Sequence, residues 1–145
     1  MGRVFRDAPM SEITLRKFER PSSKNKKELI RKFCISIGLL QPGDSRDVIV
    51  DIFEVLLDAK NKKVLLSSKE IEKEVKITRK EGVTPSNVRR QLVRLKRMNI
   101  IETIKNKYRL KEFNTLEDIL HEIKKFSLEP TFQRINEYAK TIDDL

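Results

Sequence analysis

The most informative chemistry in this sequence is a run of cationic side chains on one short segment. Residues 84–98 contain no acidic residue and five cationic ones: Arg89, Arg90, Arg94, Lys96 and Arg97. Guanidinium groups donate paired hydrogen bonds to phosphate oxygens and to the acceptor edge of guanine. The segment therefore predicts a surface that binds an anion, and a nucleic acid is the favoured class.

Patterns for catalysis and for metal binding are missing from the sequence. One cysteine excludes an internal disulfide, and one histidine argues against a zinc site. Four scattered glycines form neither a phosphate-cradling loop nor a dinucleotide-binding fingerprint. The chain shows no nucleophile paired with a base and no carboxylate pair in a site-like context. We expect no enzyme activity, no metal and no cofactor.

The net charge of the chain is unevenly distributed. The 145 residues include 32 Lys or Arg and 22 Asp or Glu, a formal net charge of +10. Residues 1–44 carry +5, residues 45–113 carry +8, and residues 114–145 carry −3. The middle segment is therefore the predicted anion-binding part. No apolar run approaches the ~18 residues of a membrane span, and no signal-peptide pattern opens the chain. We expect a cytoplasmic protein without a membrane partner.

The cationic segment is predicted to be a helix over residues 84–98. Thr84 is suited to the N-cap and Pro85 to the first helical position. Helical spacing of 100° per residue places Val88, Leu92 and Leu95 on one inward stripe. The outward face then carries Ser86, Arg90, Val93 and Arg97, flanked by Asn87, Arg89 and Arg94.

The same spacing argument predicts five further helices. They cover residues 23–40, 45–59, 67–76, 115–128 and 131–142, and Glu129-Pro130 is expected to break the chain between the last two. The expected N-caps of the first four are Ser22 or Ser23, Ser45, Ser67 and Thr115. Residues 1–22 show no sustained period and are expected to form an N-terminal arm.

A hairpin is predicted over residues 99–111, because the apolar period changes from 3.6 to 2 directly after Met98. Its tip is expected at Lys105-Asn106, since Asn tolerates the positive φ of a tight turn. Lys107, Arg109 and Lys111 then share one face of the second strand.

Residues 45–111 thus follow the order helix, short helix, linker, basic helix, hairpin. Together with Ser67–Ile71, Val83–Leu92, Leu95 and Asn99–Glu102, this order resembles the winged helix-turn-helix transcription regulators of archaea and bacteria. We therefore expect a mainly α protein with a small β-hairpin. Its parts would be an arm (1–22), an N-terminal helix (23–44), a winged helix-turn-helix core (45–113) and a C-terminal helical pair (114–145). The linker from Ile77 to Val83 is longer than the tight turn usual in that family.

The resemblance also implies site residues. Base-reading positions would fall on Ser86, Asn87, Arg89, Arg90 and Arg94, and wing contacts on Lys105 and Lys107. Arg97 also joins the predicted site. Three further cations are expected to contact phosphates: Lys80, Arg79 and Arg109.

The leading functional hypothesis is sequence-specific binding of double-stranded DNA by a transcriptional regulator. The alternative is a winged-helix interaction module in a replication, transcription or RNA-processing assembly, where the basic face contacts RNA or an acidic protein. The apolar stripes of residues 114–145 either pack on the core or pair with a second copy. We expect a homodimer through this segment, because two recognition helices then read a palindromic site.

Overall fold

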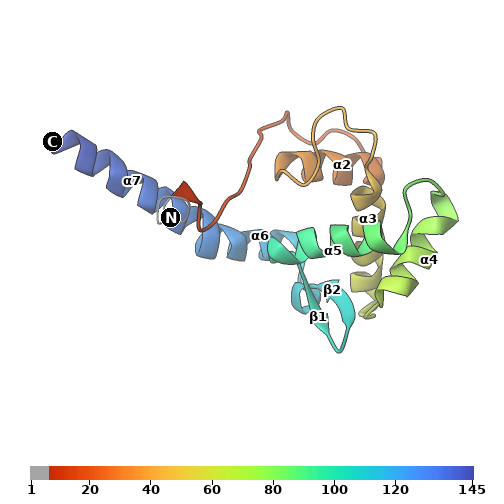
Figure 1. Ribbon diagram of the computed structural model, residues 1–145. Helices are drawn as coiled ribbons and strands as arrows, with labels where there is room; N and C mark the ends of the chain where they lie inside the picture. The colour runs from red at the N-terminus through yellow and green to blue at the C-terminus, as the bar shows by residue number, and fades with distance from the viewer. Residues whose placement is uncertain (1–6) are drawn as a thin grey trace.

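The computed structural model describes residues 7–145, which are mainly helical with one two-stranded antiparallel hairpin (Figure 1). This confirms the predicted fold class at that level. The elements are α2 (Lys26–Ser36), α3 (Val48–Lys62), α4 (Ser68–Thr78), α5 (Pro85–Arg97), β1 (Ile101–Ile104), β2 (Lys107–Leu110), the 3-10 turn η1 (Lys111–Phe113), α6 (Leu116–Ile123), the π-helical segment η2 (Lys124–Leu128) and α7 (Glu129–Asp143).

Helix α3 is the centre of the core. It packs against α2, α4, α5 and β2, and eight of its 15 residues are buried. Its apolar residues are therefore covered on several sides. Phe53 also meets Phe33 of α2 edge to face, with ring centroids 5.6 Å apart.

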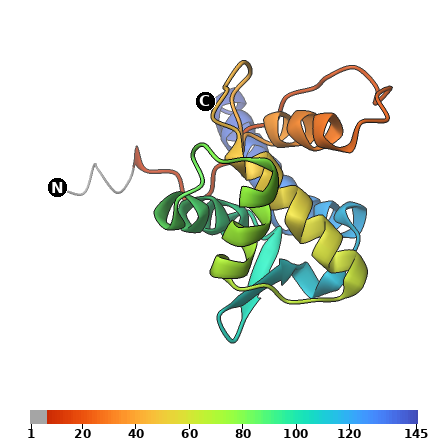
Figure 2. The same ribbon diagram turned by 90° about the vertical axis from the view of Figure 1, so that its right-hand side faces the viewer.

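The hairpin follows α5 directly and projects from the core (Figures 1 and 2). Ile101 pairs with Leu110 and Ile104 with Lys107, so the tip lies at Lys105-Asn106 as predicted. Both tip residues have positive φ, 50° and 64°, the pattern of the turn that matches strand twist. The sequence did not predict that Leu66 adds an antiparallel bridge to Tyr108.

Two predicted helix starts are wrong. Helix α2 begins after Asn25, whose side chain accepts from the Glu28 N–H, and not after Ser22 or Ser23. Helix α3 begins after Asp47 rather than Ser45, and the Asp47 carboxylate pairs with arginines instead of capping the helix. The predicted caps Ser67, Thr84 and Thr115 are confirmed, with Ser67 and Glu70 forming a full capping box.

The predicted chain break at Glu129-Pro130 is also wrong. Helix α6, η2 and α7 follow one another without a non-helical residue, and α7 leads away from the core (Figure 1). The Glu129 N–H bonds to the Lys124 carbonyl, five residues back. This widened turn accommodates Pro130, which has no N–H to donate and whose ring crowds a regular helical turn.

Within the described part of the expected arm, residues 7–22, the stretch around Thr14 and Arg16 contacts the core. The Arg16 N–H donates to the Ser36 carbonyl at 2.8 Å, and its guanidinium donates to the Ile35 carbonyl and the Gln41 side chain at 2.9 Å each. A Cβ added at Gly38, where φ is +80°, would lie 2.8 Å from the Thr14 side chain. Residues 1–6 lie outside the described part of the chain.

Candidate nucleic-acid interface

The orientation of α5 is set by its inner stripe and its N-cap. Val88, Leu92 and Leu95 are fully buried, as the predicted spacing requires. The Thr84 hydroxyl accepts from the Asn87 N–H at 3.1 Å, and Pro85 occupies the first turn. With these contacts in place, the cationic side of α5 is the side that faces solvent.

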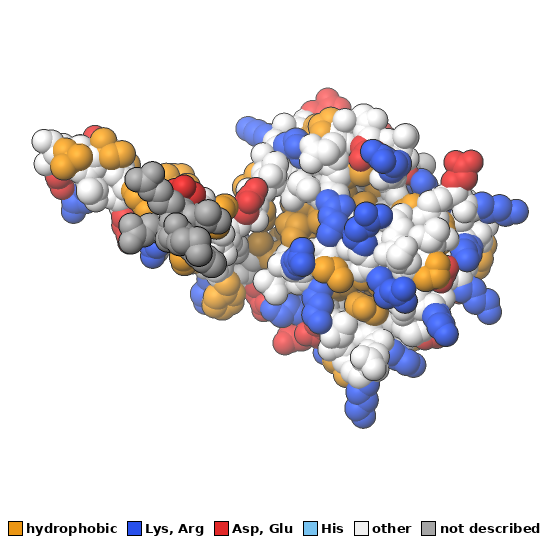
Figure 3. All heavy atoms as spheres, in the orientation of Figure 1, with side chains coloured by type: hydrophobic (Ala, Val, Ile, Leu, Met, Phe, Trp, Pro, Cys, Tyr) orange, Lys and Arg blue, Asp and Glu red, His pale blue; other side chains and the backbone are white. Residues whose placement is uncertain are grey.

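The outer face of α5 presents a cationic surface that includes one exposed apolar residue, Val93. Ser86, Arg89, Arg90, Lys96 and Arg97 are all exposed, and no acidic residue interrupts the helix. In Figure 3, Lys and Arg side chains gather over this face of the core. Within residues 7–145, neither Arg89 nor Arg97 forms an ion pair, so their donors are available to a ligand. Arg97 shares a shallow hollow with Glu12, whose negative charge weakens the positive electrostatic potential at the C-terminal end of α5.

Asn87 is a half-buried connector at the start of α5. Its amide donates to the Gly82 carbonyl at 2.7 Å, and its oxygen accepts from Arg90 and Gln91 at 3.1 Å each. Asn87 therefore ties the preceding loop to α5 and orients the Arg90 guanidinium. A signal was present in the sequence, since the third helical position is one from which side chains commonly reach back toward the cap.

Arg94 is likewise held inside the protein. It donates to the Leu39 carbonyl at 2.6 Å and to the Gln91 side chain at 2.8 Å. The first of these bonds ties α5 to the turn after α2. Burial among these partners makes Arg94 a positioning residue for the helix rather than a free donor.

Arg79 follows α4 and enters an ion-pair network on α3. It pairs with Asp47, and its Nε lies 2.7 Å from Oδ2 of Asp51, which is only 3% exposed. Arg31 contacts Asp47 at 2.5 Å, and Lys27 contacts Asp51 at 2.5 Å. The hydrogen bond that Lys27 donates to Asp51 raises the pKa of Lys27 above its usual value, because the carboxylate favours the charged ammonium.

The extent of α4 also changes the linker. The helix continues to Thr78, so the linker that follows it is shorter than the predicted Ile77–Val83. Among the cations of this loop, Arg79 is engaged with α3, while Lys80 is exposed. Of these two cations, Lys80 is the one whose side chain is exposed to solvent.

In the hairpin, too, some cations are exposed and others are paired within the protein. Lys105 and Lys107 are exposed at the tip. Arg109 pairs with Glu102 at 2.8 Å, and its guanidinium lies 4.7 Å from the centre of the Phe113 ring. Burial acts to raise the pKa of Glu102, but the Glu112 N–H and the Arg109 guanidinium outweigh it and lower that pKa. Glu102 and Arg109 therefore brace the base of the hairpin.

The structure thus separates the predicted site residues into two groups. Half-buried side chains with partners inside the protein are Asn87, Arg94, Arg79 and Arg109. Exposed side chains are Ser86, Arg89, Arg90, Arg97, Lys80, Lys105 and Lys107. The predicted site did not include Lys96, which donates to the Thr103 hydroxyl at 3.2 Å and links α5 to β1.

Comparisons of this chain with protein-family models, curated proteins and solved structures found no match.

Across residues 7–145, none of the helices combines the length and the apolar character that a membrane crossing needs. The same residues contain no group of three or more His, Cys, Asp or Glu side chains arranged to hold a metal ion. The buried Cys34 thiol has its pKa raised to about 12 by burial.

Proposed function

We propose that this protein binds double-stranded DNA as a transcriptional regulator of the winged helix-turn-helix type. The observation that carries the proposal is the acid-free outer face of α5, where exposed Arg89 and Arg90 stand beside a hairpin with Lys105 and Lys107 at its tip. The order α3, α4, α5, hairpin supports it, as does the Leu66 bridge that adds a third short strand segment beside the hairpin.

In this proposal α5 enters the major groove, which is wide enough to admit a helix. Arg89 and Arg90 donate to guanine edges, and Arg90 is held ready by the Asn87 oxygen 3.1 Å away. Lys105, Lys107 and Lys80 contact phosphates, which set register and affinity without reading sequence. Asn87 and Arg94 contribute by positioning α5 and not by contacting DNA, because their own polar groups are hydrogen-bonded within the protein.

The first test is selection of bound sequences from a random pool of DNA duplexes. Recovery of one preferred sequence supports the proposal. Sequence-blind, salt-labile duplex binding alongside tight binding to single-stranded RNA would instead favour the interaction-module alternative.

The second test uses variants on the selected duplex. Arg90→Ala is expected to weaken binding by about 1–3 kcal/mol and to relax the preference at one base pair. Lys107→Ala is expected to weaken all duplexes alike and to reduce the salt slope by about one. Arg134→Ala, which removes an exposed arginine of α7 paired with Glu137, is the matched control and should bind as the wild type does. Undiminished binding by Arg89→Ala, Arg90→Ala and their double variant would refute the proposal.

A further inference from the structure

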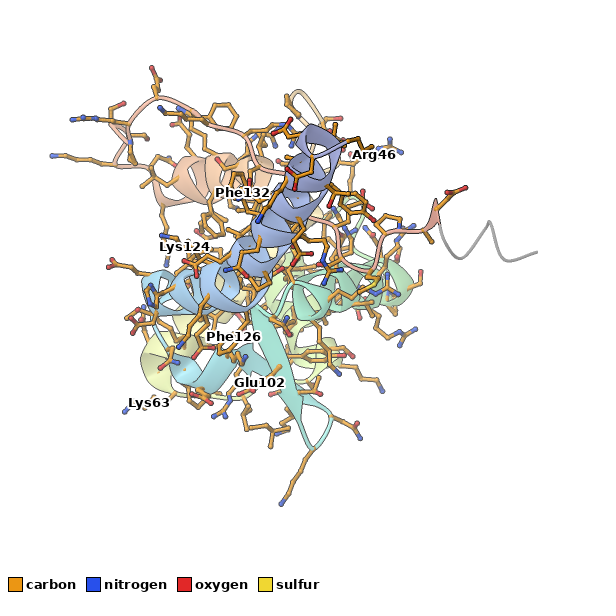
Figure 4. The ribbon with its side chains drawn as sticks, turned by 90° about the vertical axis from the view of Figure 1, so that its left-hand side faces the viewer. Arg46, Lys63, Glu102, Lys124, Phe126 and Phe132 are labelled. Atoms are coloured by element: carbon orange, nitrogen blue, oxygen red, sulfur yellow. The ribbon has the colours of Figure 1, made fainter. Side chains whose placement is uncertain are left out.

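Helix α7 leaves most of an apolar face uncovered in the described chain, with arm residues that include Pro9, Met10 and Leu15 beside it. Phe132, Ile135, Tyr138 and Ile142 are 63%, 56%, 68% and 64% exposed, although they share one side of the helix. The main contacts of α7 are with η2, the segment that precedes it. Figure 3 shows hydrophobic side chains along this projecting helix, and Figure 4 labels Phe132 on it.

The spacing of this face is that of a coiled-coil seam. Five residues recur at intervals of four and three: Leu128, Phe132, Ile135, Ala139 and Ile142. In heptad notation they alternate between positions d and a, which face the partner helix. The opposite side is polar and carries an ion pair between Arg134 and Glu137 at 2.7 Å. A seam this narrow matches one partner helix rather than a broad globular surface.

We propose that α7 pairs in parallel with α7 of a second copy of this chain. Identical seams satisfy one another in register, because each a position then meets its own counterpart and each d position does the same. An open apolar hollow of about 500 Å³, lined by Leu15, Leu128, Phe132 and Ile135 among others, lies beside the seam and receives side chains of the second copy.

The charges beside the seam decide the direction. In a parallel pair, the facing g and e positions within α7 are Thr131 with Asn136 and Tyr138 with Asp143, so no like charges meet. In an antiparallel pair, Glu129 faces Asp143 of the other copy, which is repulsive. Parallel pairing also holds both cores at the same end of the paired helices. Resting on the proposed function, this arrangement directs two copies of α5 toward one duplex.

The first experiment measures self-association without DNA. Sedimentation equilibrium of the full chain is expected to show a concentration-dependent rise toward twice the 17.1 kDa of one copy. Two heptads make a short seam, so the dimer should dissociate on dilution. Ile142→Asp should remain monomeric at every concentration, whereas Thr141→Asp adds the same charge one residue away, outside the seam, and should dimerise as the wild type does. A wild type that stays monomeric at high concentration, or an unaffected Ile142→Asp, would overturn the proposal.

The second experiment tests direction with single cysteines at two a positions, Phe132→Cys and Ala139→Cys. A parallel pair brings each cysteine to its own counterpart, so air oxidation should cross-link both variants. An antiparallel pair can bring only one of two positions seven residues apart near its own copy, and failure of either variant would overturn the parallel arrangement. The parent chain is the control, because its Cys34 is fully buried.

These results are separable from the proposed function. Ile142→Asp keeps the whole of α5 and the hairpin, so DNA binding by this monomer to half of a selected palindrome tests that function alone. Thermal unfolding monitored by circular dichroism should confirm that its core is intact, since α7 has no buried residue in the described structure.

Discussion

Helices α5 and α7 are both amphipathic, yet they expose opposite kinds of surface. The inner stripe of α5, Val88, Leu92 and Leu95, is fully buried, and four of its five cations are exposed. The apolar residues of α7 are more than half exposed, and its charges are mixed. The same helical pattern therefore leaves a cationic face exposed in one case and an apolar face exposed in the other. The difference depends on whether another element covers the stripe.

The two helices differ because of what precedes them. Thr84 caps α5, and Asn87 and Arg94 tie it to the loop before it and to the turn after α2. Helix α7 instead continues from η2, whose widened turn carries the chain past Pro130 and away from the core. Bonds to distant segments hold α5 in place, whereas α7 is continuous only with its neighbour in sequence.

The largest expected effect contrasts one apolar residue from each helix. Leu92→Ala should lower the free energy of unfolding by about 2–5 kcal/mol, because it leaves a cavity under α5. Phe132→Ala should change it by less than about 0.5 kcal/mol in dilute, monomeric protein. Urea denaturation measures both values. If both variants lost the same free energy of unfolding, α7 would be packed within the monomer. The proposed difference between α5 and α7 would then be wrong.

A smaller effect is expected within α5, between two neighbouring residues that the sequence predicts as base-reading positions. Asn87→Ala should destabilise the protein by about 1–3 kcal/mol, since it leaves the Gly82 carbonyl and two donors without their partner. Ser86→Ala, at an exposed position, should stay within about 0.5 kcal/mol of the wild type. Equal unfolding midpoints in urea would show that Asn87 does not position the helix.

The smallest effect concerns the brace at the base of the hairpin. The folded state lowers the pKa of Glu102, so its contribution to stability is present above the ordinary glutamate pKa and is lost as the pH falls through the folded value. Glu102→Gln should remove this loss, a change of about 1 kcal/mol or less for a partly exposed pair. Unfolding free energies measured from pH 6 down to pH 3 test it. Glu112→Gln keeps the backbone N–H that donates to Glu102, so its pH profile should match the wild type.

Local features of this fold were predictable, because local physics produces them. The stripe of Val88, Leu92 and Leu95 follows from helical period, and the caps at Ser67 and Thr84 follow from hydroxyls that satisfy free N–H groups. The bridge at Leu66 was missed, since a single residue carries no period. Pro130 was interpreted as a break, because a π turn that accommodates proline leaves no clear pattern in the sequence.

The sequence by itself determined the order of the helices and the hairpin, which stripe of α5 is apolar, and that its other side is cationic and free of acid. Only the tertiary structure decided which cations remain available. Arg79 meets Asp47, 32 residues earlier, and Arg94 meets the Leu39 carbonyl, 55 residues earlier. Helical period relates residues three or four positions apart, so pairings over these distances arise only when the chain has packed.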